Sequence, residues 1–241
     1  MSYTGKFPLP PVALEVICTT VDDVRAAEDG GAARVELVAS LDRGGMTPPL
    51  ALVDAVLAAV RVPVRVMVRA SESHEIHHAT MRAALIEAAR EIGTRAPDGI
   101  VFGAVRNGTV DEALLDAIAG AAGRPVTFHR AFEAVERGDD AIDVLAAHTA
   151  VDLVLCDGGP GAWPTRAARI AAWTTRAGGR PRVMPGGGIT DDAIEALAQQ
   201  PGIVDLHVGR LVRHPEMVAG RVSAPRVAAV VERLQRIRAG E

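Results

Sequence analysis

The sequence predicts one (β/α)8 barrel, the TIM-barrel fold, as a single domain over residues 1–241, with residues 1–12 as an N-terminal leader. The first observation is size: the chain has 241 residues, 49% of them hydrophobic, and a typical barrel has roughly 250. The second is pattern, because short runs rich in Val, Ile and Leu alternate with Ala-rich segments of helical period. The third is number, since eight such strand and helix units favour a closed barrel over an open sheet.

The predicted elements follow in order along the chain. Strands are expected where β-branched residues cluster between turn residues, at residues 13–19, 34–39, 64–69, 99–103, 126–130, 153–156, 182–185 and 205–208. Helices are expected where an apolar period ends at Gly or Pro, at residues 21–28, 49–60, 111–122, 191–199 and 225–238. Trp163 and Trp173 are predicted to pack in an irregular stretch after Gly158 and Gly159. An open doubly wound sheet is the alternative, but no G-x-G-x-x-G turn follows the first strand.

Composition excludes several classes of function. The net charge is −4 and no basic run is present, which argues against nucleic acid as a partner. No signal segment and no apolar run of membrane-spanning length is found, so we expect no membrane contact and a cytoplasmic location. Cys18 and Cys156 are too few for a disulfide framework and are expected to be reduced and buried. The single lysine, Lys6, precedes the first strand, which excludes a Schiff-base lysine within the barrel.

Charged residues within and at the end of strands are the candidate catalytic residues. The outward face of a barrel strand packs under apolar helices, so Glu15 and Glu36 are expected to point inward. Arg69, His129 and Arg130 stand at the C-terminal ends of their strands, where barrel enzymes carry their sites. Carboxylates and an imidazole in a narrow interior are suited to general acid/base catalysis, because burial moves their pKa values toward neutrality.

A structural role is the alternative for the same residues. Buried charges persist in proteins when they are paired, so Glu15, Glu36 and Arg65 are equally consistent with an internal ion-pair network. Arg130 has a possible partner of its own in Glu133, three residues further on.

Two further motifs predict ligand binding. Gly186, Gly187 and Gly188 precede a helix start, and Gly209 with Arg210 follows the last strand; backbone N–H groups there are predicted to bind an anion. A tight turn without ligand is the alternative, and the following Asp191 and Asp192 would repel an anion.

The segment 74–78 reads H-E-I-H-H and matches the H-E-x-x-H zinc-protease motif, which makes His74 and His78 candidate metal ligands. An accidental match in a loop between strand and helix is the alternative. His148, His207 and His214 form no cluster in the sequence and receive no predicted role.

An ordered set of motifs resembles the CutC family. The motifs are L-E-V (14–16), G-G-A-A-R-V-E-L (30–37), G-G-M-T-P (44–48), V-M-V-R (66–69), D-G-I-V-F-G (98–103), V-T-F-H-R-A-F (126–132) and M-P-G-G-G-I (184–189). The resemblance covers about residues 13 to 210. It implies a cytoplasmic barrel that forms homo-oligomers, is linked to copper homeostasis and binds copper.

This chain departs from that family at two points. Two cysteines that the family often carries, proposed as copper ligands, are replaced by Ile17 and Val38, neither of which binds copper(I). After Arg69 the family's loop is replaced by residues 70–73, A-S-E-S, and the histidine cluster, which implies a changed ligand.

Two functions follow, with a metal ion or small molecule as partner. The first is a copper-binding homeostasis protein; the second is a lyase, isomerase or hydrolase acting on a small anionic or phosphorylated metabolite through Glu15 or Glu36, Arg69, His129 and Arg130. A non-catalytic anion sensor would need only the arginines.

Overall fold

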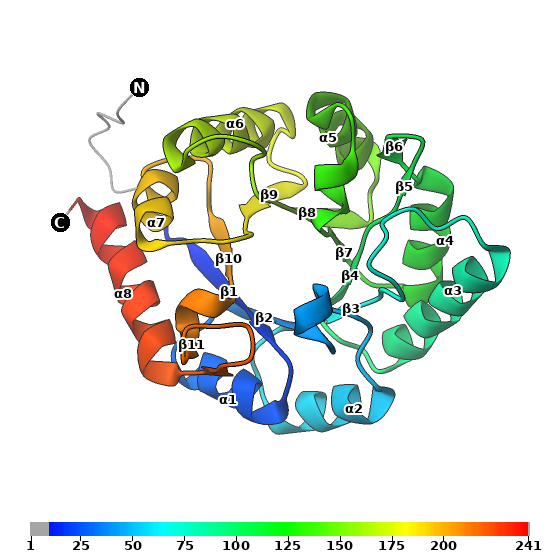
Figure 1. Cartoon of the computed structure of the whole chain (residues 1–241), viewed down its shortest axis with the longest axis horizontal. Coiled ribbons are helices and arrows are strands. Elements are labelled where there is room, and N and C mark those ends of the chain that lie inside the picture. Colours follow the sequence, from blue (N-terminus) through cyan, green and yellow to red (C-terminus); the bar gives the residue numbers. More distant parts are fainter. Residues whose placement is uncertain (1–9, 241) are drawn as a thin grey trace.

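The computed structural model describes residues 10–240, and in these the main chain forms an eight-stranded parallel sheet rolled into a barrel (Figure 1). The strand order is β10-β1-β2-β3-β4-β7-β8-β9, and the end strands β10 and β9 contact each other, as a barrel requires. The predicted TIM barrel is therefore confirmed. Residues 1–9 of the predicted leader lie outside the described residues.

The strands run where the sequence predicts them, with ends shorter by one or two residues in several cases. They are β1 (Ala13–Cys18), β2 (Arg34–Leu37), β3 (Val64–Met67), β4 (Gly99–Phe102), β7 (Val126–Phe128), β8 (Val151–Cys156), β9 (Arg182–Pro185) and β10 (Asp205–Val208). Two short antiparallel hairpins stand apart from the barrel: β5 (Val105–Arg106) with β6 (Thr109–Val110), and β11 (Arg213–His214) with β12 (Arg221–Val222).

Helices surround the barrel, and no helix of the described residues is both long and apolar enough to cross a membrane. They are α1 (Val21–Asp29), α2 (Leu50–Ala59), α3 (Ala79–Thr94), α4 (Glu112–Ala122), α5 (Gly138–Ala147), α6 (Trp163–Arg176), α7 (Asp191–Ala198) and α8 (Ala224–Ala239). Three 3-10 turns, η1 (Leu41–Arg43), η2 (Arg130–Ala134) and η3 (Arg210–Val212), follow strand ends or loops at the barrel mouth.

The irregular stretch predicted around Trp163 and Trp173 is wrong, because both residues belong to helix α6. Pro164 sits in the first turn, where its missing N–H costs nothing, and the Ala-rich sequence that follows favours a helix. The predicted packing role holds for Trp173, whose ring meets Phe132 edge-on at 5.1 Å.

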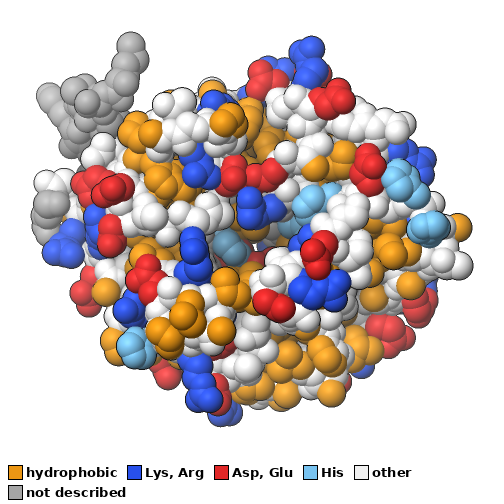
Figure 2. Space-filling view, viewed as in Figure 1, with side chains coloured by type: hydrophobic (Ala, Val, Ile, Leu, Met, Phe, Trp, Pro, Cys, Tyr) orange, Lys and Arg blue, Asp and Glu red, His pale blue; other side chains and the backbone are white. Residues whose placement is uncertain are grey.

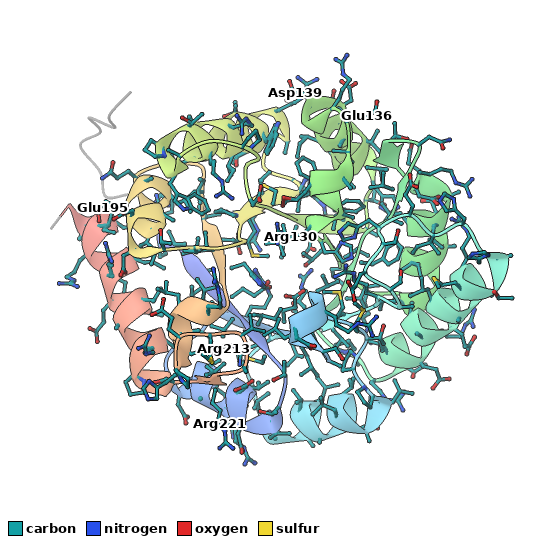
Figure 3. All side chains as sticks on the ribbon, viewed as in Figure 1. Arg130, Glu136, Asp139, Glu195, Arg213 and Arg221 are labelled. Carbon is teal, nitrogen blue, oxygen red and sulfur yellow. The ribbon has the colours of Figure 1, made fainter. Side chains whose placement is uncertain are left out.

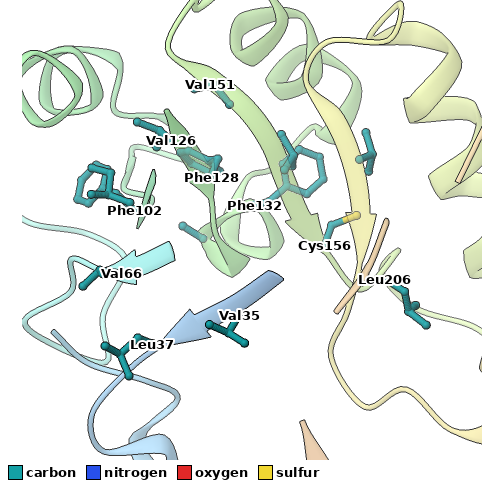
Figure 4. Close-up of a cluster of buried hydrophobic side chains, with 14 of the residues drawn as sticks. Val35, Leu37, Val66, Phe102, Val126, Phe128, Phe132, Val151, Cys156 and Leu206 are labelled. Carbon is teal, nitrogen blue, oxygen red and sulfur yellow. The ribbon is translucent and has the colours of Figure 1, made fainter. Parts of the chain in front are cut away.

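Strand alternation divides the buried residues into an outer and an inner set. The outer set lies between strands and helices and includes Val35, Phe102, Phe128 and Cys156 (Figure 4). Cys18 belongs to the same set. Helices α3 and α4 also approach each other closely, since a Cβ on Gly93 of α3 would lie 2.1 Å from the carbonyl oxygen of Ala122 of α4. Burial of such apolar area is the main source of stability.

The inner set consists of two small apolar clusters and several charges. Ile17, Val38, Met67 and Val101 form one cluster, and Leu153, Leu155 and Met184 form the other. Arg65 fills another part of the interior, where it donates to Asp152 at 2.6 Å and to Asp98 at 3.0 Å. Arg65 thus belongs to an internal ion-pair network, the structural role weighed for it from the sequence. Among the described residues, apolar side chains and paired charges therefore fill these parts of the interior.

Candidate functional site

A cavity of about 250 Å³ opens where the strands end, at the C-terminal end of the barrel. The face seen in Figure 2 is hollowed at its centre, and Arg130 lies beside this hollow (Figure 3). Its wall comes from residues that directly follow β3, β7, β9 and β10 and from the inner faces of β1 and β2. The residues that line it are Ile17, Glu36, Leu41, Gly44, Met67, Arg69, His74, His129, Arg130, Leu155, Gly187, Gly188, Ile189, His207, Gly209, Arg210 and Val218.

The floor of the cavity carries a buried cluster from three neighbouring strands. Glu15 on β1 lies in register with His207 on β10, and its Oε1 is 2.8 Å from the imidazole Nδ1. The other imidazole nitrogen, Nε2, is 3.5 Å from Oε2 of Glu36 on β2. Behind them Arg34 donates to the second oxygen of Glu15 and, at 3.1 Å, to Asp205. Glu15 and Glu36 thus point inward, as alternation predicts.

The two glutamates differ in charge because their partners differ. Burial raises the pKa of Glu15, but Arg34 and His207 outweigh it and hold this pKa at about 2. Burial raises the pKa of Glu36 to about 7, although His207 opposes the change. Burial lowers the pKa of His207, yet the hydrogen bond to Glu15 and the charge of Glu36 raise it overall. Oε1 of Glu36 is buried without a hydrogen-bond partner among the described residues.

Two guanidinium groups stand on the cavity wall. Arg69 is held by carbonyl oxygens, at 3.0 Å from Gly44 and 2.8 Å from Glu72. Arg130 has half of its side chain exposed and lies 3.4 Å from both Glu133 and Asp157, so the pair with Glu133 weighed from the sequence is present. Both arginines line the cavity.

His129 is buried beside them and is neutral. Its Nδ1 accepts the N–H of Ala131 at 3.0 Å, so Nε2 carries the ring proton and cannot ligate a metal. Burial, His74 and Arg69 all keep the pKa of His129 well below its usual range. The ring of His74 lies 5.2 Å from that of His129, and burial together with Arg69 lowers the pKa of His74 to about 4. His129 is therefore a hydrogen-bond donor at neutral pH.

The glycine turn after β9 lines the same cavity. Gly187 and Gly188 both have positive φ, 81° and 74°, which other residues rarely adopt. A Cβ on Gly187 would lie 3.2 Å from the guanidinium carbon of Arg130, so this glycine allows the arginine to lie against the turn. Gly209 and Arg210 also line the cavity, whereas Gly186 lies outside the lining and faces Leu155 and His207.

The H-E-x-x-H motif does not form a zinc-protease site, because residues 74–78 are not helical. Glu75 bridges to Val105 in an extended stretch, and His78 precedes α3 as an exposed residue. His74 lines the cavity and His78 does not. The spacing that joins two histidines on one helix face is therefore lost.

Sequence reasoning missed the two residues that organise the floor, His207 and Arg34. Among the described residues, Glu15, Glu36 and His207 form the group whose donor atoms lie within 4.8 Å of one another, close enough for one metal ion. For His207 the sequence did carry a signal, a polar residue between Leu206 and Val208 within a strand. The same kind of signal identified both glutamates.

Among the described residues, the cysteine ligands expected for copper(I) are missing from this site, whose one sulfur-containing lining residue is Met67. Ile17 and Val38, at the positions where the family often has cysteine, pack together in an inner apolar cluster. Cys18 and Cys156 lie in the outer core, where burial raises the pKa of both thiols. Since the thiolate is the form that binds metals, neither cysteine fits a copper(I) site.

Comparison with known proteins identifies the family. The model of the CutC family matches residues 12–211. A CutC family protein of Rhizobium meliloti is 36% identical over 201 residues, which cover 81% of this chain and 80% of that protein. The human copper homeostasis protein cutC homolog is 33% identical over 204 residues, covering 80% of this chain and 71% of that protein.

Solved structures agree on the fold. A CutC protein of Streptococcus agalactiae superposes with a TM-score of 0.74 at 23% identity, covering 82% of this chain and 98% of that one. A dihydrodipicolinate synthase of Bacillus anthracis superposes with a TM-score of 0.66 at 14% identity, covering 96% and 77%. Motifs, family model and sequence relatives agree, and the chain belongs to the CutC family.

Proposed function

We propose that this protein takes part in copper homeostasis and does so by binding a small anionic ligand in the cavity at the barrel mouth. The copper role is supported by family membership and by the name of the human relative. The anionic ligand is supported by one observation: Arg69, Arg130 and the turn of Gly187 and Gly188 surround the same cavity.

The chemistry of these groups fits an anion. Guanidinium groups present several N–H donors in a fixed plane and bind carboxylate or phosphate oxygens in pairs. Backbone N–H groups of a glycine turn with positive φ add further donors. At about 250 Å³ the cavity suits a ligand with few heavy atoms. Asp191, expected to repel an anion, is paired with Arg233 on α8, which offsets its charge.

Inorganic phosphate is the first probe for this site, and calorimetry on the purified full chain measures its affinity. We expect the variants R69M and R130M to weaken phosphate binding by at least about 10-fold, since each removes a charged hydrogen bond. The control is R176M, because Arg176 pairs with Asp143 on the outer surface. Equal weakening in all three variants, or no binding by the parent, contradicts the proposal.

Copper binding itself is tested by a copper(I) competition titration against a chelator. The described residues that line the cavity offer imidazole and carboxylate donors and a single thioether, that of Met67, but no thiolate, so we expect this chain to bind copper(I) weakly or not at all. The double variant H74A/H78A is run beside the parent. Tight binding that this variant loses would assign copper(I) to the loop of residues 74–78.

An enzyme acting on the same anion is the second candidate, supported by the shared cavity that Glu36, Arg69, His129 and Arg130 line. Arg69 and Arg130 would hold the substrate, and neutral His129 would donate through Nε2–H to an oxygen on which negative charge develops. Turnover of phosphorylated metabolites, followed by phosphorus NMR for the parent and H129N, tests this candidate. No turnover of any metabolite by the parent rejects it.

We also propose a cytoplasmic location and a homo-oligomeric state. The location is supported by Cys18 and Cys156, which are both free thiols. The oligomeric state rests on the family resemblance alone. Cell fractionation and light scattering after size-exclusion chromatography measure the two properties.

A further inference from the structure

We propose that the floor of the cavity binds a divalent transition-metal ion through Nε2 of His207 and the carboxylate of Glu36, while Glu15 orients the imidazole. This site is separate from the proposed anion site, since none of its ligands is an arginine or a glycine. It differs from a copper(I) thiolate site in the type of donor.

The hydrogen bond between Glu15 and His207 determines which nitrogen is free. Arg34 forms a buried ion pair with the Glu15 carboxylate, and a carboxylate paired in this way only accepts hydrogen bonds. Nδ1 of His207, 2.8 Å from Oε1 of Glu15, therefore donates its proton. Nε2 then bears the lone pair of the neutral ring. A carboxylate that fixes the imidazole in this way is the usual second layer of a metal-binding histidine.

Glu36 provides the second ligand. It is 2% exposed, and its Oε1 has no hydrogen-bond partner among the described residues. Its Oε2 lies 3.5 Å from Nε2 of His207, which is long for a hydrogen bond. Two metal–ligand bonds of about 2.1 Å that end on these atoms would meet at about 113°, close to the tetrahedral angle. The separation therefore suits two ligands of one ion better than a direct contact.

The charge balance around the site favours a cation. Three buried carboxylates, on Glu15, Glu36 and Asp205, face two guanidinium groups, on Arg34 and Arg182. In the state that can bind a metal, with His207 neutral and all three carboxylates ionised, these groups sum to one negative charge, and an unpaired charge is costly in a region of low dielectric. A divalent ion between Glu36 and His207 would compensate it.

The site opens toward the cavity. His207 and Glu36 both line the cavity, whereas Glu15 does not. Coordination positions left free by the two protein ligands would therefore face the space where a small ligand enters, as in metal sites that keep an open position for water or substrate. Imidazole with carboxylate suits Zn²⁺ or Cu²⁺, and Cu²⁺ is the stronger binder of the two.

The first test is a calorimetric titration of Zn²⁺ into the metal-free full chain, in buffer without phosphate. We expect one ion per chain and affinity reduced at least about 10-fold in E36Q and in H207N. The matched control is H214A, an exposed histidine on β11 outside the cavity, which should bind as the parent does. Circular dichroism checks that each variant is folded.

Paramagnetic resonance of Cu²⁺ in the parent protein needs no variant and covers the case in which E36Q or H207N does not fold. Coupling to one nitrogen is expected, from His207. No binding by the parent, equal affinity in E36Q, loss in H74A/H78A, or coupling to two or more nitrogens overturns the proposal. Failure of the anion proposal gives a different result: R130M would bind phosphate as tightly as the parent does. That result would leave the Zn²⁺ affinities of the parent, E36Q and H207N unaffected.

Discussion

Replacing Arg34 by methionine should destabilise the protein strongly, because this side chain neutralises two carboxylates in the barrel interior. Arg34 is 7% exposed, donates to Glu15 and lies 3.1 Å from Asp205. Breaking a buried ion pair by removing one partner costs about 3–5 kcal/mol. The lower value, about 3 kcal/mol, applies here because Glu15 keeps His207 and Asp205 keeps Arg182 at 3.2 Å.

Urea unfolding at neutral pH measures this cost as a shift in the midpoint at constant slope. The expected loss of about 3 kcal/mol corresponds to a Tm lower by roughly 6–12 °C for a chain of this size. The double variant R34M/E15Q should recover most of the loss, because it also removes the carboxylate that R34M leaves without its cation.

Arg182 gives the matched control, since it also pairs with Asp205 but has 44% of its side chain exposed. R182M is expected to cost less than about 1 kcal/mol. A loss below about 1 kcal/mol for R34M, or a double variant less stable than R34M, refutes the argument that Arg34 holds Glu15 in its charged form.

Three further predictions concern the surroundings of the site. Burial and Asp157 raise the pKa of Glu133 from 4.5 to about 7, so the folded protein should lose stability as pH rises between these values. In urea unfolding, E133Q should be as stable as the parent at low pH and more stable than the parent above pH 7; equal stability at both pH values would contradict this. G93A should lower stability by about 3 kcal/mol, because its Cβ would overlap Ala122; an unchanged Tm would contradict the close approach of α3 and α4. Arg213 joins the β11–β12 hairpin to the barrel through the carbonyl oxygens of Gly220 and Ile17, so R213M should speed amide exchange in residues 213–222, and parent-like exchange there would disprove that role.

Loops and helices with weak local signals were harder to predict. Helix α6 contains two tryptophans and follows a glycine-rich loop, so its period was hidden by residues that also occur in irregular segments. The H-E-x-x-H motif is the opposite case: its helical spacing occurs in a segment that is not helical and pairs with Val105, in keeping with the loop weighed as the alternative. In residues 74–78 a contact from elsewhere in the chain determined the backbone conformation, whereas in α6 the helical signal was local and was overlooked.

The sequence by itself determined the barrel, the positions of its strands and the face on which each strand residue lies. Alternation correctly assigned Glu15 and Glu36 to the interior and Cys18 to the helix side. It did so because the two-residue period of a strand is a local property, fixed by backbone geometry.

Only the tertiary structure decided which inward residues meet. Closure of the barrel puts β10 beside β1 and β1 beside β2, and the register of these pairs brings residues 207, 15 and 34 together from distant parts of the chain. Strand register depends on the packing of all eight strands and their helices, and no local pattern encodes it. The same closure sets the 3.5 Å between His207 and Glu36, the distance on which the proposed metal site depends.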